Sequence, residues 1–363
     1  MTLERIKRFQ DLMKSNRIDA SMIRTLSSFT YFADVKWLRP ALIIPAEGEP
    51  LAFIFKHEVK PFSERTCIKT VVPYGGIDEL MRGISRTLRE SGYRKVGFDV
   101  SVERDAYELF YQMFKRLNPK IEIVDVHSMI MELRMIKDAT EIERIKRASE
   151  ITDMGMETAA NAIDLGVSEL EIAAEATHTM MKKGAEHPHI YVNTGPYPRK
   201  HAEPRREIKV QAGDVVTITL AGDYECYYAN ETRTHIMENG SKEKLKALET
   251  LSNVYSLVKD KMRAGTVLNS IESQIEQALK DRGYADNYVQ GFAHSVGLLV
   301  EEDPITTIVI PHRRQVIKEN MTLAAIHAPL AIQSVGAIKC EDTFLVRSDG
   351  IEQLTKFACQ GAG

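Results

Sequence analysis

Residues that could perform chemistry concentrate in three short segments of the C-terminal half. His294 lies in residues 293–298 (AHSVGL), His327 in residues 326–329 (IHAP) and Glu341 in residues 340–343 (CEDT). An imidazole can take a proton from water near neutral pH because its ordinary pKa lies close to neutrality. Two histidines and one carboxylate, if the fold brings them together, also suit one zinc or ferrous ion and leave positions open for water.

The bulk properties of the chain exclude several classes of function. Its 363 residues are 44% hydrophobic and 27% charged, which is ordinary for a globular protein with a large core. The formal net charge of −3 gives no global attraction to nucleic acid or to an anionic membrane, so neither is expected as a partner. No apolar stretch approaches the roughly 20 residues of a spanning helix. Residues 1–8 lack an apolar signal core, so a cytoplasmic location is expected.

The cysteines follow no recognisable pairing pattern. Cys67, Cys226, Cys340 and Cys359 are scattered, without CxxC spacing. This spacing predicts neither a structural zinc site nor a disulfide framework, and reduced thiols are expected.

The first part of the chain alternates between helical and strand patterns. This alternation predicts an α/β domain over residues 1–127. A turn over residues 46–50 (AEGEP) predicts a hairpin. The expected helices cover residues 3–15, 77–91 and 105–117, and the expected strands residues 20–23, 41–45, 51–55, 95–100 and 121–126.

A second domain is expected over residues 128–363, with an α+β composition and mostly antiparallel strands. Its long first helix opens within residues 133–142, where Asp138 or Thr140 can serve as N-cap. Further helices are expected over residues 167–183, 242–263 and 268–282, and strands over residues 214–220, 224–228, 322–326 and 341–346.

Five segments in the same order resemble the creatinase, aminopeptidase P and prolidase family. They are residues 133–151, 213–216 (GDVV), 232–234 (TRT), 293–298 (AHSVGL) and 340–343 (CEDT). The resemblance covers essentially the whole chain. It implies a creatinase-type α/β N-terminal domain followed by an α+β domain of the "pita-bread" fold.

Metal-binding members of that family hold two cations with an Asp, Asp, His, Glu, Glu set. The resemblance places these positions on Thr219, Asn230, His294, His327 and Glu341. The carboxylate count therefore falls from four to one, which leaves too little negative charge for two divalent ions. A two-metal centre is not expected. The alternatives are no cofactor, or one divalent metal (Zn, Mn or Fe) on His294, His327 and Glu341, to which Asn230 could add a neutral oxygen.

Creatinase is the family's example of a site that works without those ligands, through histidine acid–base chemistry. By this resemblance His201 is the proton-transfer base, His294 binds water or substrate, and Glu341 polarises the nitrogen of the scissile bond.

Substrate-binding residues are also implied by the resemblance. Asn230 and Tyr228 fall beside the second ligand position, and Trp37 and Arg39 fall in an aromatic–x–Arg stretch of the N-terminal domain. An arginine can bind a substrate carboxylate through two hydrogen bonds, and a tryptophan can cover an apolar or cationic group. In creatinase-like members this domain reaches the site of a neighbouring subunit, so a homodimer is expected.

Structural explanations compete with these assignments. His327 could fill the space of a lost carboxylate, His201 could belong to a solvated loop, and Trp37 could be a packing residue. Glu301, where the family has a second histidine, reads as part of a surface acidic run. Lys339 replaces the arginine that usually precedes the last ligand.

The residues thus lead to an enzyme hypothesis with two alternatives. The leading hypothesis is a C–N bond hydrolase that acts on a small, carboxylate-bearing substrate by histidine acid–base chemistry, without a two-metal centre. One alternative is a single-metal Xaa-Pro dipeptidase-like peptidase acting on short peptides. The other is a non-catalytic module that uses the pita-bread fold to bind peptides.

Overall fold

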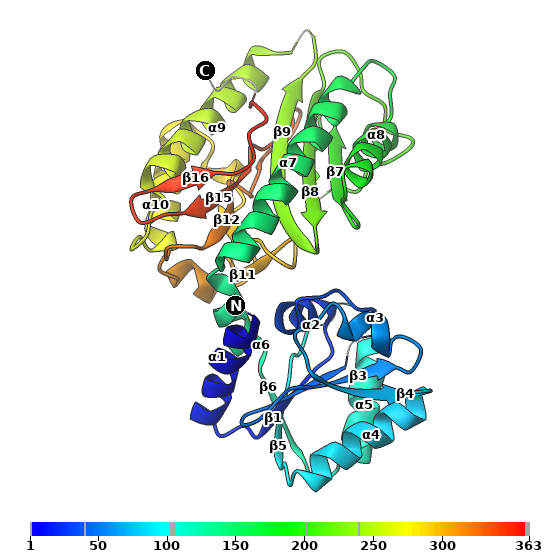
Figure 1. Cartoon of the computed structure of the whole chain (residues 1–363). Helices are drawn as coiled ribbons and strands as arrows, with labels where there is room; N and C mark the ends of the chain where they lie inside the picture. The colour runs from blue at the N-terminus through cyan, green and yellow to red at the C-terminus, as the bar shows by residue number, and fades with distance from the viewer. Residues whose placement is uncertain are drawn as a thin grey trace. The chain divides into compact units, whose positions relative to one another are not determined.

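The structure is a computed structural model that describes residues 2–39, 41–101, 103, 106–199, 202–238 and 240–359. The chain divides into two compact units, Met1–Arg134 and Met135–Gly363, which are considered one at a time (Figure 1). The expected boundary after residue 127 falls at the start of helix α6 (His127–Met135), which contains the observed division.

The first unit is an α/β domain built on a six-stranded sheet of order β4-β3-β2-β1-β5-β6. Strand β1 pairs antiparallel with β2 and parallel with β5, so the sheet is mixed. The strands are β1 (Ala20–Ile23), β2 (Leu42–Pro45), β3 (Leu51–Phe55), β4 (Thr70–Tyr74), β5 (Lys95–Phe98) and β6 (Glu122–Asp125). The helices are α1 (Thr2–Ser15), α2 (Leu26–Ala33), α3 (Val59–Ser63), α4 (Ile77–Glu90) and α5 (Ala106–Leu117).

Apolar faces of α4 and α5 cover this sheet. Leu80 and Ile84 of α4 and Phe110 and Phe114 of α5 belong to one buried cluster with strand residues. The helical periodicity of these segments therefore predicted both helices correctly. Helix α2 was missed because seven of its eight residues are buried, which removes the polar face that a periodicity search needs.

The described part of the second unit contains three antiparallel sheets, the smallest of which is the pair β13-β14. A three-stranded sheet has the order β7-β8-β9 and a five-stranded sheet the order β11-β10-β12-β15-β16, with a bridge between Thr232 and Glu341 connecting β9 to the start of β15. The strands are β7 (His189–Thr194), β8 (Val215–Tyr224), β9 (Tyr227–Ile236), β10 (Ala293–Ser295), β11 (Glu302–Ile305), β12 (Thr322–Ala325), β13 (Leu330–Ile332), β14 (Gly336–Ile338), β15 (Asp342–Val346) and β16 (Ile351–Gln353). The helices are α7 (Ala139–Asn161), α8 (Glu169–Lys182), α9 (Lys242–Lys261) and α10 (Leu268–Asp281).

Helix α7 runs along β8 and β9 (Figure 1). The approach is close at Gly222, whose backbone N–H donates to Thr152 Oγ1 at 3.1 Å. A Cβ atom at Gly222 would lie 2.5 Å from that oxygen, so a glycine is required here. Because helices occupy this side of the strands, functional side chains of β9 must project from the opposite face.

One expected strand, over residues 224–228, is wrong. The segment holds the two-residue turn of the β8–β9 hairpin, between the last residue of β8 (Tyr224) and the first of β9 (Tyr227); in this turn Glu225 has φ 47° and Cys226 has φ 70°. Two consecutive left-handed residues give the twist that a two-residue hairpin needs. The usual Asn-Gly signal is absent, so the sequence read as continuous strand.

A capping box starts α7. Asp138 accepts hydrogen bonds from the backbone N–H groups of Thr140 and Glu141, both at 3.0 Å, and Glu141 Oε2 accepts from the Asp138 N–H at 3.0 Å. Asp138 is therefore the N-cap, one of the two residues expected. The extended backbone of Asp138 separates α6 from α7.

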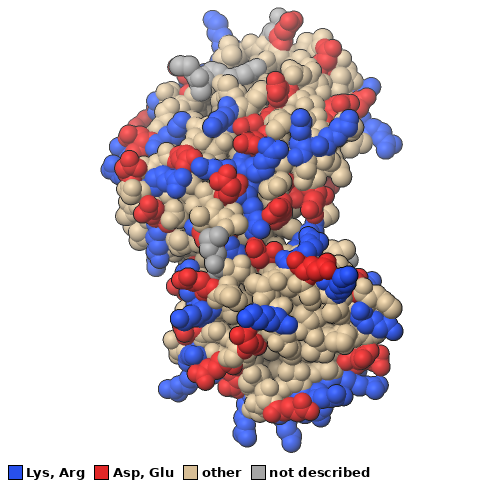
Figure 2. All heavy atoms as spheres, viewed as in Figure 1, with Lys and Arg blue, Asp and Glu red and all other residues tan. Residues whose placement is uncertain are grey.

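Lysine and arginine are interspersed with aspartate and glutamate over the face shown in Figure 2. Within the described part of the chain, no helix combines the length and apolarity needed to cross a bilayer.

Asp138→Ala should lower the free energy of unfolding by about 1 kcal/mol, because it removes a side-chain N-cap. Urea denaturation of the full chain measures this. The matched control is Glu143→Ala, an exposed acidic residue of the same first turns, which should change stability by less than about 0.5 kcal/mol. Equal losses in both variants would contradict the capping role.

Candidate active site

Four buried residues of the predicted site come together in the second unit. Asn230 lies on β9 and His294 on β10, while His327 follows β12 and Glu341 precedes β15. The sheet register explains the gathering, because His294 pairs with Ala324 on the strand that leads to His327. The bridge between β9 and Glu341 then places Asn230 close by.

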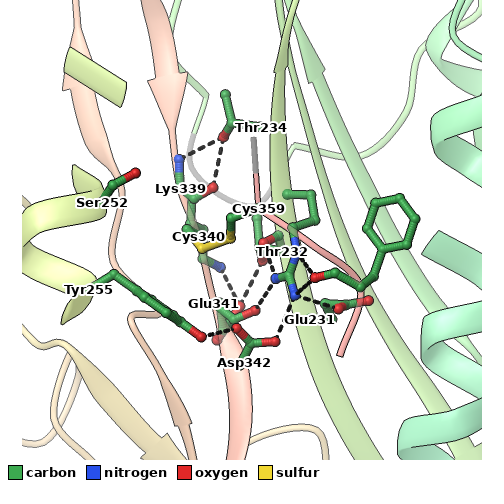
Figure 3. Close-up of a disulfide and its surroundings, with 12 residues drawn as sticks. Glu231, Thr232, Thr234, Ser252, Tyr255, Lys339, Cys340, Glu341, Asp342 and Cys359 are labelled. Atoms are coloured by element: carbon green, nitrogen blue, oxygen red, sulfur yellow. Dashed lines mark hydrogen bonds and ion pairs between the residues drawn. A yellow bond between two sulfur atoms is a disulfide. The ribbon is translucent and has the colours of Figure 1, made fainter. Parts of the chain in front are cut away.

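Glu341 is the centre of the site and is fully buried. Its Oε1 lies 3.0 Å from His327 Nδ1 and 3.5 Å from His294 Nε2. Its Oε2 lies 2.9 Å from Lys339 Nζ and accepts a hydrogen bond from Thr232 Oγ1 at 2.8 Å (Figure 3). Both carboxylate oxygens are therefore already engaged by neighbouring side chains.

These contacts decide the charge of Glu341. Burial raises the pKa of a carboxyl group, but Lys339, His327 and His294 together hold the pKa of Glu341 well below its ordinary value. Glu341 is therefore an anion at neutral pH, balanced by the Lys339 ammonium.

The two site histidines are driven in opposite directions. Burial and the nearby Lys339 charge hold the pKa of His327 well below its ordinary value, although Glu341 opposes them. Burial also disfavours charge on His294, but the hydrogen bond and charge of Glu341 raise the pKa of His294 overall. One imidazole is thus kept neutral beside another that favours a proton.

Glu301 belongs to this cluster, although the sequence placed it in a surface acidic run. Its Oε1 lies 3.5 Å from His327 Nε2, and its side chain is 26% exposed. His294, Glu301 and His327 each offer a metal-ligating atom within 4.8 Å of the others. Glu302, the next residue, begins strand β11, is buried and accepts a hydrogen bond from the Leu299 N–H, so the acidic run is not a surface run of side chains.

A cavity opens beside this cluster. Two basic side chains face it: Lys339, and Arg199, which is also paired with the buried Glu169. The cavity is lined by Tyr191, Asn193, Arg199, Ala202, Thr217, Thr219, His327, Pro329, Ala337 and Lys339. His201 lies outside the described residues. The nearest described residues on either side of it in the sequence, Arg199 and Ala202, line this cavity.

The remaining mapped polar positions make specific contacts. The Thr219 and Thr232 hydroxyl oxygens lie 2.9 Å apart. Asn230 Nδ2 lies 3.4 Å from His294 Nε2, and its Oδ1 has no hydrogen-bond partner among the described residues. Tyr228 donates its hydroxyl to the backbone oxygen of His187 at 3.3 Å, so its phenol is held by the β7 side of the sheet.

Trp37 and Arg39 belong to the first unit. Trp37 donates its indole N–H to Glu58 at 2.8 Å and packs edge-on against Phe62. Arg39 is exposed and has φ 62°.

A disulfide joins Cys340 to Cys359, so the expectation of four reduced thiols is wrong (Figure 3). The pairing depends on the return of the C-terminal segment beside β9, where the Phe357 backbone oxygen accepts from Arg233 Nε at 2.7 Å. Arg233 also pairs with Asp342 at 2.8 Å. This return of the chain is a feature of the tertiary structure, so the spacing of the cysteines in the sequence does not predict it.

The comparisons with known proteins agree with this architecture. A model of metallopeptidase family M24 matches residues 143–348, and a model of the creatinase/prolidase N-terminal domain matches residues 5–136. The chain therefore belongs to metallopeptidase family M24.

Individual relatives cover nearly the whole chain. An Xaa-Pro dipeptidase of Pyrococcus furiosus is 25% identical over 358 residues, which are 97% of this chain and 98% of that protein. A creatinase of a Bacillus species is 24% identical, over 96% of this chain and 89% of that protein. The crystal structure of the prolidase from Pyrococcus horikoshii OT3 has a TM-score of 0.87 at 24% identity and covers 98% of this chain and 99% of that one. This likeness confirms the pita-bread fold.

Lys339→Met should destabilise the protein by about 3–5 kcal/mol, because it leaves a buried carboxylate without its counter-charge. Removing both charges in Lys339→Met/Glu341→Gln should recover most of that loss. Urea denaturation of the three proteins measures the difference. If the double variant is as unstable as Lys339→Met, the two residues are not balancing each other.

Thiol titration of the denatured, unreduced protein should detect Cys67 and Cys226 but not Cys340 or Cys359. After reduction, all four cysteines should react. Four reactive thiols before reduction would contradict the disulfide.

Proposed function

We propose that this chain hydrolyses a C–N bond in a small substrate that carries a carboxylate. Membership of family M24 and the Xaa-Pro dipeptidase and creatinase among its relatives support the reaction class. The observation that carries the substrate class is the cavity, which Arg199 and Lys339 line with basic groups. Glu169 and Glu341 balance the charges of these two groups, so the support for a carboxylate-bearing substrate lies in geometry: the planar guanidinium of Arg199 offers N–H donors that suit a carboxylate.

The donors present do not fit two cations. Thr219 and Asn230 are neutral, and the one carboxylate of the five mapped positions, Glu341, is already balanced by Lys339 at 2.9 Å. Two divalent cations bound here would therefore bring positive charges that the neighbouring side chains leave largely uncompensated. We therefore propose that catalysis proceeds without a two-metal centre.

In this proposal imidazoles carry the protons. His201 takes a proton from the attacking water and returns it to the leaving nitrogen, a role suited to a histidine near neutral pH. His294 binds water or substrate. Glu341 polarises the nitrogen of the scissile bond, because its negative charge stabilises positive charge that develops on that nitrogen. Asn230 and Tyr228 complete the substrate site.

The proposed roles of Trp37 and Arg39 in substrate binding depend on a homodimer. In a homodimer, the exposed Arg39 of the N-terminal unit would bind substrate carried by the partner subunit. Light scattering of the purified chain tests the dimer independently of any activity.

Two other functions remain as alternatives. A single-metal Xaa-Pro dipeptidase-like peptidase is favoured by the grouping of His294, Glu301 and His327. A non-catalytic peptide-binding module would bind Xaa-Pro peptides without turnover.

Turnover should be measured on Xaa-Pro dipeptides, amidino acids resembling creatine and N-acyl amino acids, each with and without added divalent metal. On the substrate that is hydrolysed, His201→Ala should lower kcat by about 100-fold or more, the contribution typical of general acid–base catalysis. The matched control is His178→Ala, an exposed histidine of α8, which should leave kcat unchanged. Unchanged kcat in His201→Ala would contradict its role, and binding without turnover across the panel would favour the peptide-binding module.

A further inference from the structure

We propose that the disulfide between Cys340 and Cys359 is a redox-sensitive latch on the candidate active site. A dithiol reductant opens the latch. Opening releases residues 356–359, the C-terminal strap, and loosens the backbone that holds Glu341. The proposal rests on the proposed function for one readout only, the rate of turnover.

The disulfide links the strap to the residue next to the site. Cys340 is buried and immediately precedes Glu341 in the chain, whereas Cys359 is partly exposed at the end of the strap (Figure 3). The bond spans 19 positions of sequence and so closes a covalent ring around β15 and β16. Cys359 is the more exposed of the two residues, and access is one of the factors that decide which sulfur a thiolate attacks.

The chain leading into the strap is fixed by β15. The Leu354 N–H donates to the Thr343 backbone oxygen at 2.9 Å. The Thr355 hydroxyl donates to Asp342 Oδ1 at 2.6 Å and accepts from the Thr343 N–H at 3.1 Å. Both Leu354 and Thr355 are buried, so they stay with the folded unit whether the disulfide is open or closed.

The strap itself is held more weakly. Lys356 and Ala358 are exposed, and Phe357 is only partly buried. The N–H groups of Lys356 and Phe357 donate to Asp153 Oδ1 at 2.8 and 3.4 Å, and the Phe357 oxygen accepts from Nε of Arg233 at 2.7 Å and also from its Nη2. A short, exposed terminal segment opens locally at low cost in free energy, so the disulfide is the tie that keeps these bonds closed.

Arg233 connects the strap to Glu341. Its guanidinium is buried, and its Nη1 donates to the backbone oxygens of Thr232 and Glu341, both at 2.8 Å. The backbones of Thr232 and Glu341 also bond to each other, at 3.0 and 3.1 Å. Release of Phe357 takes an acceptor from this buried cation and admits water to it, which weakens its bonds to Glu341. The disulfide thus reaches Glu341 by two routes, through Cys340 and through Arg233.

The opening step is a thiol–disulfide exchange. A thiolate of the dithiol attacks the Cys359 sulfur, the bond between the two protein sulfurs breaks, and Cys340 leaves as a thiolate that takes up a proton. The second thiol of the reductant then displaces Cys359 and closes the internal disulfide of the reductant. The protein gains two electrons and two protons, and the dithiol loses the same number. The reverse reaction closes the latch.

Hydrogen exchange of the native full chain before and after reduction tests the latch. Dithiothreitol is the probe, and alkylation of a sample followed by peptide mapping establishes that Cys340 and Cys359 are reduced. We expect exchange to become at least about 10-fold faster in residues 356–359 and at the N–H groups of Thr232 and Glu341, because their hydrogen bonds open more often. Exchange in helix α10, which is remote in sequence from both, should not change.

Cys359→Ser should reproduce the exchange of the reduced chain without any reductant, and dithiothreitol should then change nothing further. The matched control is Cys226→Ser, which alters a cysteine of the same unit that lies outside the disulfide. This control should exchange like the wild type and still respond to dithiothreitol. Thermal unfolding establishes that each variant is folded.

Reduction that leaves exchange at Thr232 and Glu341 unchanged would overturn the proposal, and so would a disulfide that dithiothreitol cannot reduce in the folded chain. On any substrate that is hydrolysed, reduction should lower kcat/KM by at least about 5-fold and reoxidation should restore it, whereas turnover indifferent to reduction also overturns the latch. The two proposals fail separately. Faster exchange without turnover of any substrate removes the proposed reaction alone, and turnover with unchanged exchange removes the latch alone.

Discussion

The buried pairing of Glu341 with Lys339 is the interaction on which the rest of the site depends. A carboxylate with no solvent exposure is stable as an anion only if opposite charge and hydrogen bonds replace its hydration. Lys339 supplies that charge from within the chain, at 2.9 Å, where family relatives with a full ligand set would rely on bound cations. The same pair drives the two histidines in opposite directions, because Glu341 raises the pKa of His294 and Lys339 lowers the pKa of His327.

The surrounding framework holds this pair in a fixed geometry. Residues on both sides of Glu341 are restrained: Cys340 by the disulfide to Cys359, and Asp342 by Arg233 at 2.8 Å (Figure 3). The Thr232 hydroxyl donates a hydrogen bond to one carboxylate oxygen of Glu341. The backbones of Thr232 and Glu341 also form an antiparallel β-bridge. A site supported by rigid strands and outer-shell hydrogen bonds keeps its geometry better than one built on loops.

Sequence patterns predicted the fold better than they predicted the site. Long amphipathic helices such as α4 and α10 and the cap at Asp138 follow local rules, so they were found. Helix α2, buried almost all round, and the Glu225–Cys226 turn, which lacks Asn-Gly chemistry, carry no such local signal. Glu301 and the Cys340–Cys359 disulfide were missed because both depend on how distant segments return in space. The resemblance to the family predicted His294, His327 and Glu341 as site residues. The pairing of Glu341 with Lys339 was not predicted, because it depends on how the side chains pack in the folded protein.

Anomalous diffraction from crystals of the full chain grown with excess Mn²⁺ tests the central claim most directly. The account predicts at most one anomalous peak in the pocket, with the Lys339 ammonium still in contact with Glu341. Two peaks roughly 3.5–4 Å apart, the spacing of a two-metal site, with Lys339 displaced from Glu341, would contradict it.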